Sequence, residues 1–287
     1  MPLEREEFLM LEQKARDLRK LIIKTVVWAG SSHIGGSLSA IDLLTILYYK
    51  YMNIDVSIPD WEDRDRFILS KGHIGVGFAP VLADKGYFPL HWLETFNHTH
   101  SQLGMYLDKN KVPGLDASTG SLGHGLPLAF GLALSAWLRE QNFRTYCLLG
   151  DGESNEGSNW EAAMAISHYN LSNVIPIIDR NHSMLDGCTE EAMGIEPLAD
   201  KWSAFGFHVI DVEDGNDMYQ LATAIEAAHA ADIPSVIIMQ TKKGCGVAHM
   251  TDDNLFAGFD SEKQTQCLKD IDEYHDARMR RKMELIV

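Results

Sequence analysis

The stretch TYCLLGDGESNEG, residues 145–157, decides the fold. Its first half is an apolar run typical of a strand buried on both faces, and its second half is a Gly-Asp-Gly turn that leads into a helical pattern. Two glycines around a carboxylate let the backbone turn sharply and approach a ligand closely, and the following helix offers free amide groups at its N-terminus. The stretch therefore predicts a strand, a ligand-binding turn and a helix.

The same alternation of strand and helix continues along the chain. Runs rich in aliphatic residues predict four further strands, at residues 66–70, 173–178, 208–212 and 235–240. Helical patterns are predicted over about residues 1–25, 39–51, 126–140, 160–169 and 218–231, the second of them starting at the capping-box-like SAID of residues 39–42. This order predicts an α/β fold, a parallel sheet flanked by helices, which binds ligands at the carboxyl ends of its strands.

Composition and charge narrow the class of protein. The 287 residues are 45% hydrophobic and 23% charged, which predicts a globular chain, and the length allows one or two domains. The motifs described below favour a single domain over residues 1–287, with a charged helical tail from about residue 261. A net charge of −16 argues against nucleic acid and anionic membranes as partners. The four cysteines have no CxxC spacing, and the acidic N-terminus lacks a signal-peptide pattern, so we expect reduced thiols and a cytoplasmic protein.

A metal site is predicted where two neighbouring strands end. Asp151 ends the strand of the opening stretch, and Asn181 follows 30 residues later at the end of the next strand. A carboxylate beside a phosphate needs a cation between them. A carboxylate, an amide oxygen, a backbone carbonyl, a water and two phosphate oxygens complete the octahedral shell that Mg²⁺ demands. The pair therefore predicts a magnesium-bound diphosphate.

With this pair of motifs the sequence resembles the thiamine-diphosphate-dependent enzymes, and more narrowly transketolase. The resemblance extends over essentially the whole chain. The motifs that carry it, besides the opening stretch, are SHIGG (32–36), SKGH (70–73), STGSLGHG (118–125) and DRNHSMLDG (179–187). It implies the thiamine-diphosphate-binding fold, in its diphosphate-binding domain.

The resemblance also implies roles for individual residues. Asp151, Asn181 and the carbonyl of Ser183 would hold the metal, which is Mg²⁺ or in its place Ca²⁺ or Mn²⁺. His33 and His73 match pocket histidines that face the diphosphate or the sugar; together with Glu156, from the network that contacts the neighbouring subunit, they are the expected catalytic residues. The expected cofactor-binding residues are Gly120, Leu122, Gly150, Asp151, Gly152, Glu153 and Asn181.

The implied activity is transfer of a two-carbon ketol unit from a ketose, expected to be phosphorylated, to an acceptor. In the family, a glutamate that activates the cofactor lies on a following pyrimidine-binding domain, and this sequence stops before such a domain. We therefore expect the N-terminal subunit of a split transketolase. A C-terminal transketolase subunit would supply the activating glutamate, in an α2β2 heterotetramer.

Two departures from the family leave the substrate open. Members resembling this chain carry Gly-His-Pro before a Val-Pro-Gly turn, whereas GMYL (104–107) stands before VPG (112–114) here. A later Trp-His-Gly histidine is also replaced, by FAG (256–258). Either the pocket takes an unusual ketose or acceptor, or another side chain fills the space, the candidates being Tyr106, His98, His100 and His249.

Three other functions remain as alternatives. The two-carbon unit could pass to a lipoyl or other carrier-bound acceptor, or the chain could be a subunit of the 2-oxo acid dehydrogenase type, for which Gly-Asp-Gly and Asn181 would serve equally well. A scaffold without cofactor is the third, against which the retained Asp151, Asn181 and Glu156 argue. The basic cluster at residues 277–282 is expected to be a solvated helix face.

Overall fold

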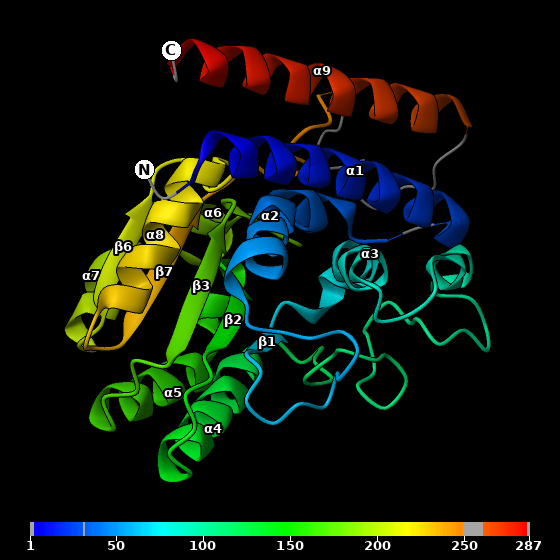
Figure 1. The fold of residues 1–287 in the computed structure, drawn as a ribbon. Helices are drawn as coiled ribbons and strands as arrows, with labels where there is room; N and C mark the ends of the chain where they lie inside the picture. The colour runs from blue at the N-terminus through cyan, green and yellow to red at the C-terminus, as the bar shows by residue number, and fades with distance from the viewer. Residues whose placement is uncertain (1–2, 31, 249–260, 286–287) are drawn as a thin grey trace.

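Five parallel strands form the centre of the chain (Figure 1). The computed structural model describes residues 3–30, 32–248 and 261–285. Across the sheet the strands lie in the order β1 (Arg66–Leu69), β2 (Thr145–Gly150), β3 (Val174–Arg180), β7 (Ser235–Gln240) and β6 (His208–Val212). They are the five strands that the sequence predicts, and the predicted fold class is confirmed.

Side chains alternate between two cores because successive residues of a strand face opposite sides of the sheet. In β2, Tyr146 and Leu148 belong to one core, whereas Cys147 and Leu149 belong to the other. The first core packs under α1 (Arg5–Ala29), α2 (Ile34–Ile46) with the π-helical turn η1 (Leu47–Tyr51), α3 (Gly75–Lys85) and α8 (Met218–Ala230). The second packs under α4 (Gly125–Leu138), α5 (Gly157–His168) and α7 (Leu198–Ala204).

The remaining elements are short. Three short 3₁₀ helices, η2 (Gly72–Ile74), η3 (Leu90–Thr95) and η4 (Gly152–Asn155), follow strands or connect loops. After β3 comes a two-stranded antiparallel hairpin of β4 (Ser183–Met184) and β5 (Gly187–Cys188), followed by α6 (Thr189–Met193). None of the helices in the described parts of the chain is long and apolar enough to cross a membrane.

Helix α2 begins at Ile34, five residues before the predicted start, so the predicted boundary is wrong. The residues taken for a capping box have other partners. Ser39 Oγ donates to Asp179 Oδ2 at 2.6 Å, and Asp42 pairs with Arg19, so neither caps a helix end. Long-range partners therefore claim the polar side chains that the local pattern assigned to the helix start.

Helix α9 (Ser261–Leu285) lies along α1 on the outside of the molecule (Figure 1). Cys267 and Ile271 bury its apolar side. The expectation of a solvated basic face is wrong at Arg278, which is 7% exposed because its guanidinium pairs with the buried carboxylate of Glu12 at 2.5 Å.

The carboxyl ends of the central strands lie at one edge of the sheet. The parallel register pairs Gly150 with Asp179, and Arg180 with Gln240. The loops that follow β2, β3 and β7 therefore leave the sheet side by side. This edge is where ligands bind in sheets of this kind.

Candidate active site

A cavity of about 500 Å³ opens at this edge of the sheet. Its walls come from the start of α2, the turn after β1, the loop before α4 and the loops after β2, β3 and β7. The structure brings all the predicted site residues together in its lining: His33, His73, Gly120, Leu122, Gly150, Asp151, Gly152, Glu153, Glu156, Asn181 and Ser183.

The carboxylate of Asp151 is 2% exposed and is held by the turn itself and by the next strand. Its Oδ1 accepts from the Gly152 amide at 2.8 Å. Its Oδ2 accepts from the His182 amide at 2.7 Å and from Arg180 Nη1 at 3.0 Å. Burial and the nearby Asp179 raise the pKa of Asp151, while Arg180 opposes the shift. The carboxylate is thus fixed beside the residues that follow β3.

Asn181 and Ser183 form a tight turn next to Asp151. The backbone passes through His182 at a φ of 60°, and the Ser183 amide donates to Asn181 Oδ1 at 3.1 Å. Asn181 Nδ2 donates to Asp179 Oδ2 at 3.2 Å. The turn therefore gathers a carboxylate, an amide oxygen and backbone carbonyls, and hard oxygen donors of these kinds suit Mg²⁺.

Glu153 connects three loops of the cavity wall. Its Oε1 accepts from the Gly123 amide at 2.8 Å and from the hydroxyl of Ser70, and its Oε2 accepts from the Gly150 amide at 3.0 Å. Burial raises its pKa. Both carboxylate oxygens have protein donors, so Glu153 fixes the shape of the wall that it lines.

Glu156 is an exposed residue at the edge of the cavity, directly before α5. The loop before α4 lies against it, since a Cβ on Gly123 would stand 2.5 Å from Glu156 Cβ. Gly123 has a φ of +87°, which also favours glycine. This close approach places the loop that carries Gly120 and Leu122 on the wall beside Glu156.

Tyr106 also lines the cavity, with 47% of its surface exposed. Its ring packs over Gly120, where a Cβ would lie 3.1 Å from Tyr106 Cδ1. Of the candidates to replace the missing histidine, Tyr106 is the one in the described cavity lining. His98 instead bonds the Trp28 carbonyl at 2.8 Å, and His249 lies outside the described residues.

The two predicted histidines face each other in the cavity, with ring centroids 5.0 Å apart. Burial, Lys71 and His33 lower the pKa of His73 to about 3. Burial and Lys243 lower the pKa of His33. At neutral pH His73 is therefore an uncharged imidazole that can accept a hydrogen bond at one ring nitrogen and donate one at the other.

Replacing His73 by asparagine is expected to reduce the loss of stability in acid. The pKa of His73 in the folded chain lies below its usual 6.5, so as the pH falls the unfolded chain binds a proton at His73 before the folded chain does. The free energy of unfolding therefore decreases as the pH drops from 6.5 towards 3. Between about pH 7.5 and 5, we expect the wild type to lose about 1 kcal/mol more unfolding free energy than the variant in urea titrations. The exposed His91→Asn is the control, and parallel curves for wild type and His73→Asn would contradict the expectation.

Two lysines that the sequence analysis did not single out complete the cavity. Lys71 is 1% exposed and forms an ion pair with the fully buried Asp179. Lys243, in the loop after β7, donates from Nζ to Ser183 Oγ at 2.6 Å. Both line the cavity. A lysine shortly after the end of a parallel strand was the available signal, because ligands bind at the carboxyl ends of such strands.

Comparison with known proteins agrees with this geometry. The family model "Transketolase, thiamine diphosphate binding domain" matches residues 11–259. The chain belongs to the transketolase family. The predicted family and the predicted transketolase-type enzyme class are confirmed, and the matching domain is the one that binds thiamine diphosphate.

Two relatives of similar length are named as transketolase subunits. The chain is 41% identical to the 6-deoxy-6-sulfo-D-fructose transketolase subunit SqwG of Clostridium sp. (strain MSTE9), over 85% of this chain and 88% of that one. It is 40% identical to an apulose-4-phosphate transketolase subunit of Actinobacillus succinogenes, over 83% of this chain and 86% of that one.

Solved transketolases share the fold but are longer. That of Campylobacter jejuni matches with a TM-score of 0.84 and 27% identity, over 91% of this chain and 43% of its own. That of Leishmania mexicana matches with a TM-score of 0.82 and 27% identity, over 96% of this chain and 46% of its own. This transketolase domain thus spans less than half the length of the solved enzymes.

Proposed function

We propose that this chain is the thiamine-diphosphate-binding subunit of a two-chain transketolase, folded as one diphosphate-binding domain over residues 1–287. It transfers a two-carbon ketol unit from a ketose to an acceptor. The observation that carries the proposal is the convergence of Asp151, Asn181, Ser183, Lys71 and Lys243 in one cavity at the carboxyl edge of the sheet. Oxygen ligands beside two ammonium groups suit a metal-bound diphosphate.

In this proposal Asp151, Asn181 and the carbonyl of Ser183 hold a divalent cation, Mg²⁺ or in its place Ca²⁺ or Mn²⁺. The donor set is made of hard oxygens, as such cations require. At Gly152 a Cβ would stand 3.0 Å from Met184 Cβ, so glycine keeps space between the turn after β2 and the β4–β5 hairpin, and in this proposal its backbone approaches the diphosphate. Lys243 offsets negative charge that a single cation leaves on a diphosphate.

In this proposal the other residues of the lining bind and orient the cofactor and the sugar. Thiamine diphosphate supplies the carbanion chemistry of ketol transfer when bound. Gly120 and Leu122 lie on the wall where the rings of the cofactor would pack. His33 and His73, whose pKa values burial lowers, offer neutral imidazoles that can accept a hydrogen bond from a sugar hydroxyl at one ring nitrogen and donate one at the other. Tyr106 occupies the wall beside them and can donate its hydroxyl hydrogen to the substrate.

Relatives guide the choice of substrate. Their names give 6-deoxy-6-sulfo-D-fructose and apulose-4-phosphate as substrates, sugars that end in a sulfonate or a phosphate. We therefore infer a ketose donor with an anionic terminus. An aldehyde acceptor fits this family better than the lipoyl or 2-oxo acid alternatives, because the relatives are transketolases.

A partner subunit completes the proposed enzyme. Two of the relatives of similar length are named as subunits of transketolases, and such a name implies a second chain in their enzymes. We propose that a C-terminal transketolase subunit carries the activating glutamate and that the two chains form an α2β2 heterotetramer. The exposed Glu156 at the cavity edge is then placed to contact the neighbouring subunit.

Co-purification with the natural partner followed by an activity screen tests the function. Ketose phosphates and sulfonates are offered as donors against aldehyde and lipoyl-carrier acceptors, with thiamine diphosphate and Mg²⁺ present. We expect ketol transfer to an aldehyde. Decarboxylation of 2-oxo acids, or transfer to the lipoyl carrier alone, would favour the alternatives and refute the proposal.

A further inference from the structure

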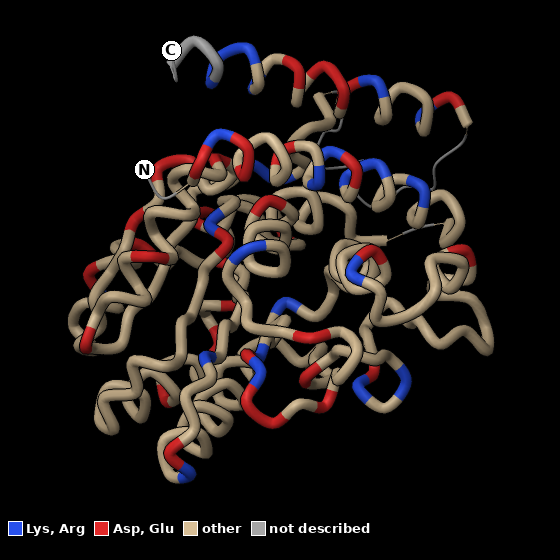
Figure 2. The backbone as a smooth tube through the Cα atoms, viewed as in Figure 1, with Lys and Arg blue, Asp and Glu red and all other residues tan. Residues whose placement is uncertain are grey.

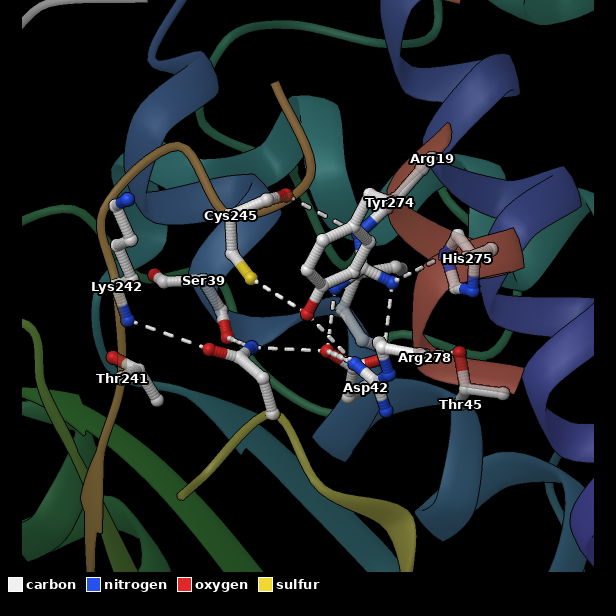
Figure 3. A network of polar contacts seen from close by, with 12 residues as sticks. Arg19, Ser39, Asp42, Thr45, Thr241, Lys242, Cys245, Tyr274, His275 and Arg278 are labelled. Carbon is white, nitrogen blue, oxygen red and sulfur yellow. Dashed lines mark hydrogen bonds and ion pairs between the residues drawn. The ribbon is translucent and has the colours of Figure 1, made fainter. Parts of the chain in front are cut away.

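A buried polar network joins α9 to the loop at residues 241–247, which follows β7 (Figure 3). Arg19 of α1 and Asp42 of α2 are completely buried, with Nη1 to Oδ1 at 2.9 Å and Nη2 to Oδ2 at 2.5 Å. Arg278 of α9 pairs with Glu12 at 2.5 Å and lies 3.7 Å from Asp42. Two guanidinium groups thus face two carboxylates, so the buried charges balance.

Tyr274 stands at the centre of this network. The centroid of its ring lies 5.4 Å from the guanidinium carbon of Arg19 and 5.3 Å from that of Arg278. Its hydroxyl oxygen accepts from Arg278 Nη1 at 2.8 Å and from Cys245 Sγ at 3.0 Å. Tyr274 is therefore a direct contact between α9 and the 241–247 loop, beside the bond from the Ala248 amide to Asp270 of α9 at 3.0 Å.

The loop is attached to the network on both sides of Lys243. After Lys243 in the chain, the Cys245 carbonyl accepts from Arg19 Nε at 3.3 Å, and a Cβ on Gly246 would stand 3.1 Å from Arg19. Before Lys243, the Lys242 amide donates to Asn216 Oδ1 at 3.3 Å, and Asn216 in turn donates to Asp42 Oδ2 at 2.9 Å. Few conformations of the loop satisfy all these contacts.

Lys243 itself points the other way, into the cavity, where its Nζ meets Ser183 Oγ. One short loop thus has a cavity lysine on one side and the α9 network on the other. A lysine side chain loses conformational entropy when it binds an anion. Lys243 therefore contributes more to anion binding if the backbone of its loop is already held in place.

We propose that Tyr274 is a positioning residue, which holds the 241–247 loop so that Lys243 reaches the anionic group bound in the cavity. Tyr274 acts through Cys245 and touches no ligand. The identity of the anion as a diphosphate rests on the proposed function, whereas the placement of the loop does not.

Other contacts of α9 provide a matched control. Charges of both signs run along α1 and α9 (Figure 2). Among them Asp272 pairs with Arg16 and Lys20 at 2.5 Å each, nearer the solvent. These pairs attach α9 to α1 but make no contact with the loop. A change at Asp272 therefore loosens the helix without acting on Lys243 directly.

The test compares Tyr274→Phe with Asp272→Asn in the full chain. Calorimetry measures Kd for thiamine diphosphate with Mg²⁺ and for inorganic diphosphate. We expect Tyr274→Phe to raise Kd about fivefold and Asp272→Asn to change it less than about twofold. Lys243→Ala should raise Kd about tenfold, and adding Tyr274→Phe to it should have no further effect, since both act through the same ammonium group.

Hydrogen exchange provides a readout that needs no ligand. Tyr274→Phe should speed exchange of the amides at residues 242–247 more than Asp272→Asn does. The proposal is overturned if the two variants behave alike in Kd and exchange, or if the effect of Tyr274→Phe persists undiminished in Lys243→Ala. If the wild type binds neither diphosphate while Tyr274→Phe still loosens the loop, the proposed function fails and the positioning role stands.

Discussion

Replacing Asp151 by alanine is expected to raise the Kd for thiamine diphosphate more than about a hundredfold in the presence of Mg²⁺. The change removes the only carboxylate of the proposed metal ligands, and the diphosphate would then meet Asn181 and a carbonyl without a bound cation. Calorimetric titration of the complex with its partner, with Mg²⁺ or with EDTA, measures the effect. The wild type should lose affinity in EDTA, and the variant should be insensitive to it.

The structure indicates that this variant still folds. Arg180, which pairs with Asp151, also pairs with Glu190 at 2.8 Å and Glu196 at 2.9 Å, so its buried guanidinium keeps partners. Asp232→Ala is the matched control, because Asp232 is exposed at the loop before β7, at the opposite edge of the sheet. Metal-dependent binding by Asp151→Ala as tight as that of Asp232→Ala would sink the assignment of the metal ligand.

Local pattern was sufficient for the parts of the fold that depend on neighbours in sequence. Strands β2 and β3 are apolar runs buried on both faces, and each ends in a polar motif at the same edge. The convergence of Asp151 and Asn181 follows from parallel register alone. For this reason the predicted site residues reached one cavity although they come from segments far apart in the chain.

Partners far apart in sequence could not be predicted in this way. Nothing near Arg278 indicates that it pairs with Glu12, 266 residues away, so its cluster looked like a solvated face. Asp42 looked like part of a capping box for the same reason, although Arg19 neutralises it and holds its pKa at about 2. Lys71 lay inside a recognised motif, yet its pairing with Asp179 depends on the order of the strands, in which β2 lies between β1 and β3.

The carboxylates that line the cavity indicate whether the chain could activate the cofactor without a partner subunit. Asp151 is engaged by Arg180 and two amides, and Glu153 by Ser70 and two amides. The other acidic residues of the described lining, Glu156 and Asp186, are exposed at its edge. A carboxylate that shifts the tautomer of an aminopyrimidine ring must hydrogen-bond to it away from water. Within the described residues, no buried carboxylate of the lining is left for this role.

The purified chain is therefore expected to catalyse ketol transfer at least about a thousandfold more slowly than the complex. Loss of general acid–base assistance has an effect of this order of magnitude. Adding the partner subunit should restore activity with saturation at one partner per chain. A partner whose proposed activating glutamate is replaced by glutamine is the matched control, because it supplies the same surface without the carboxylate. If that complex turned over like the wild type, or if the single chain did so unaided, this domain would carry an activating group of its own.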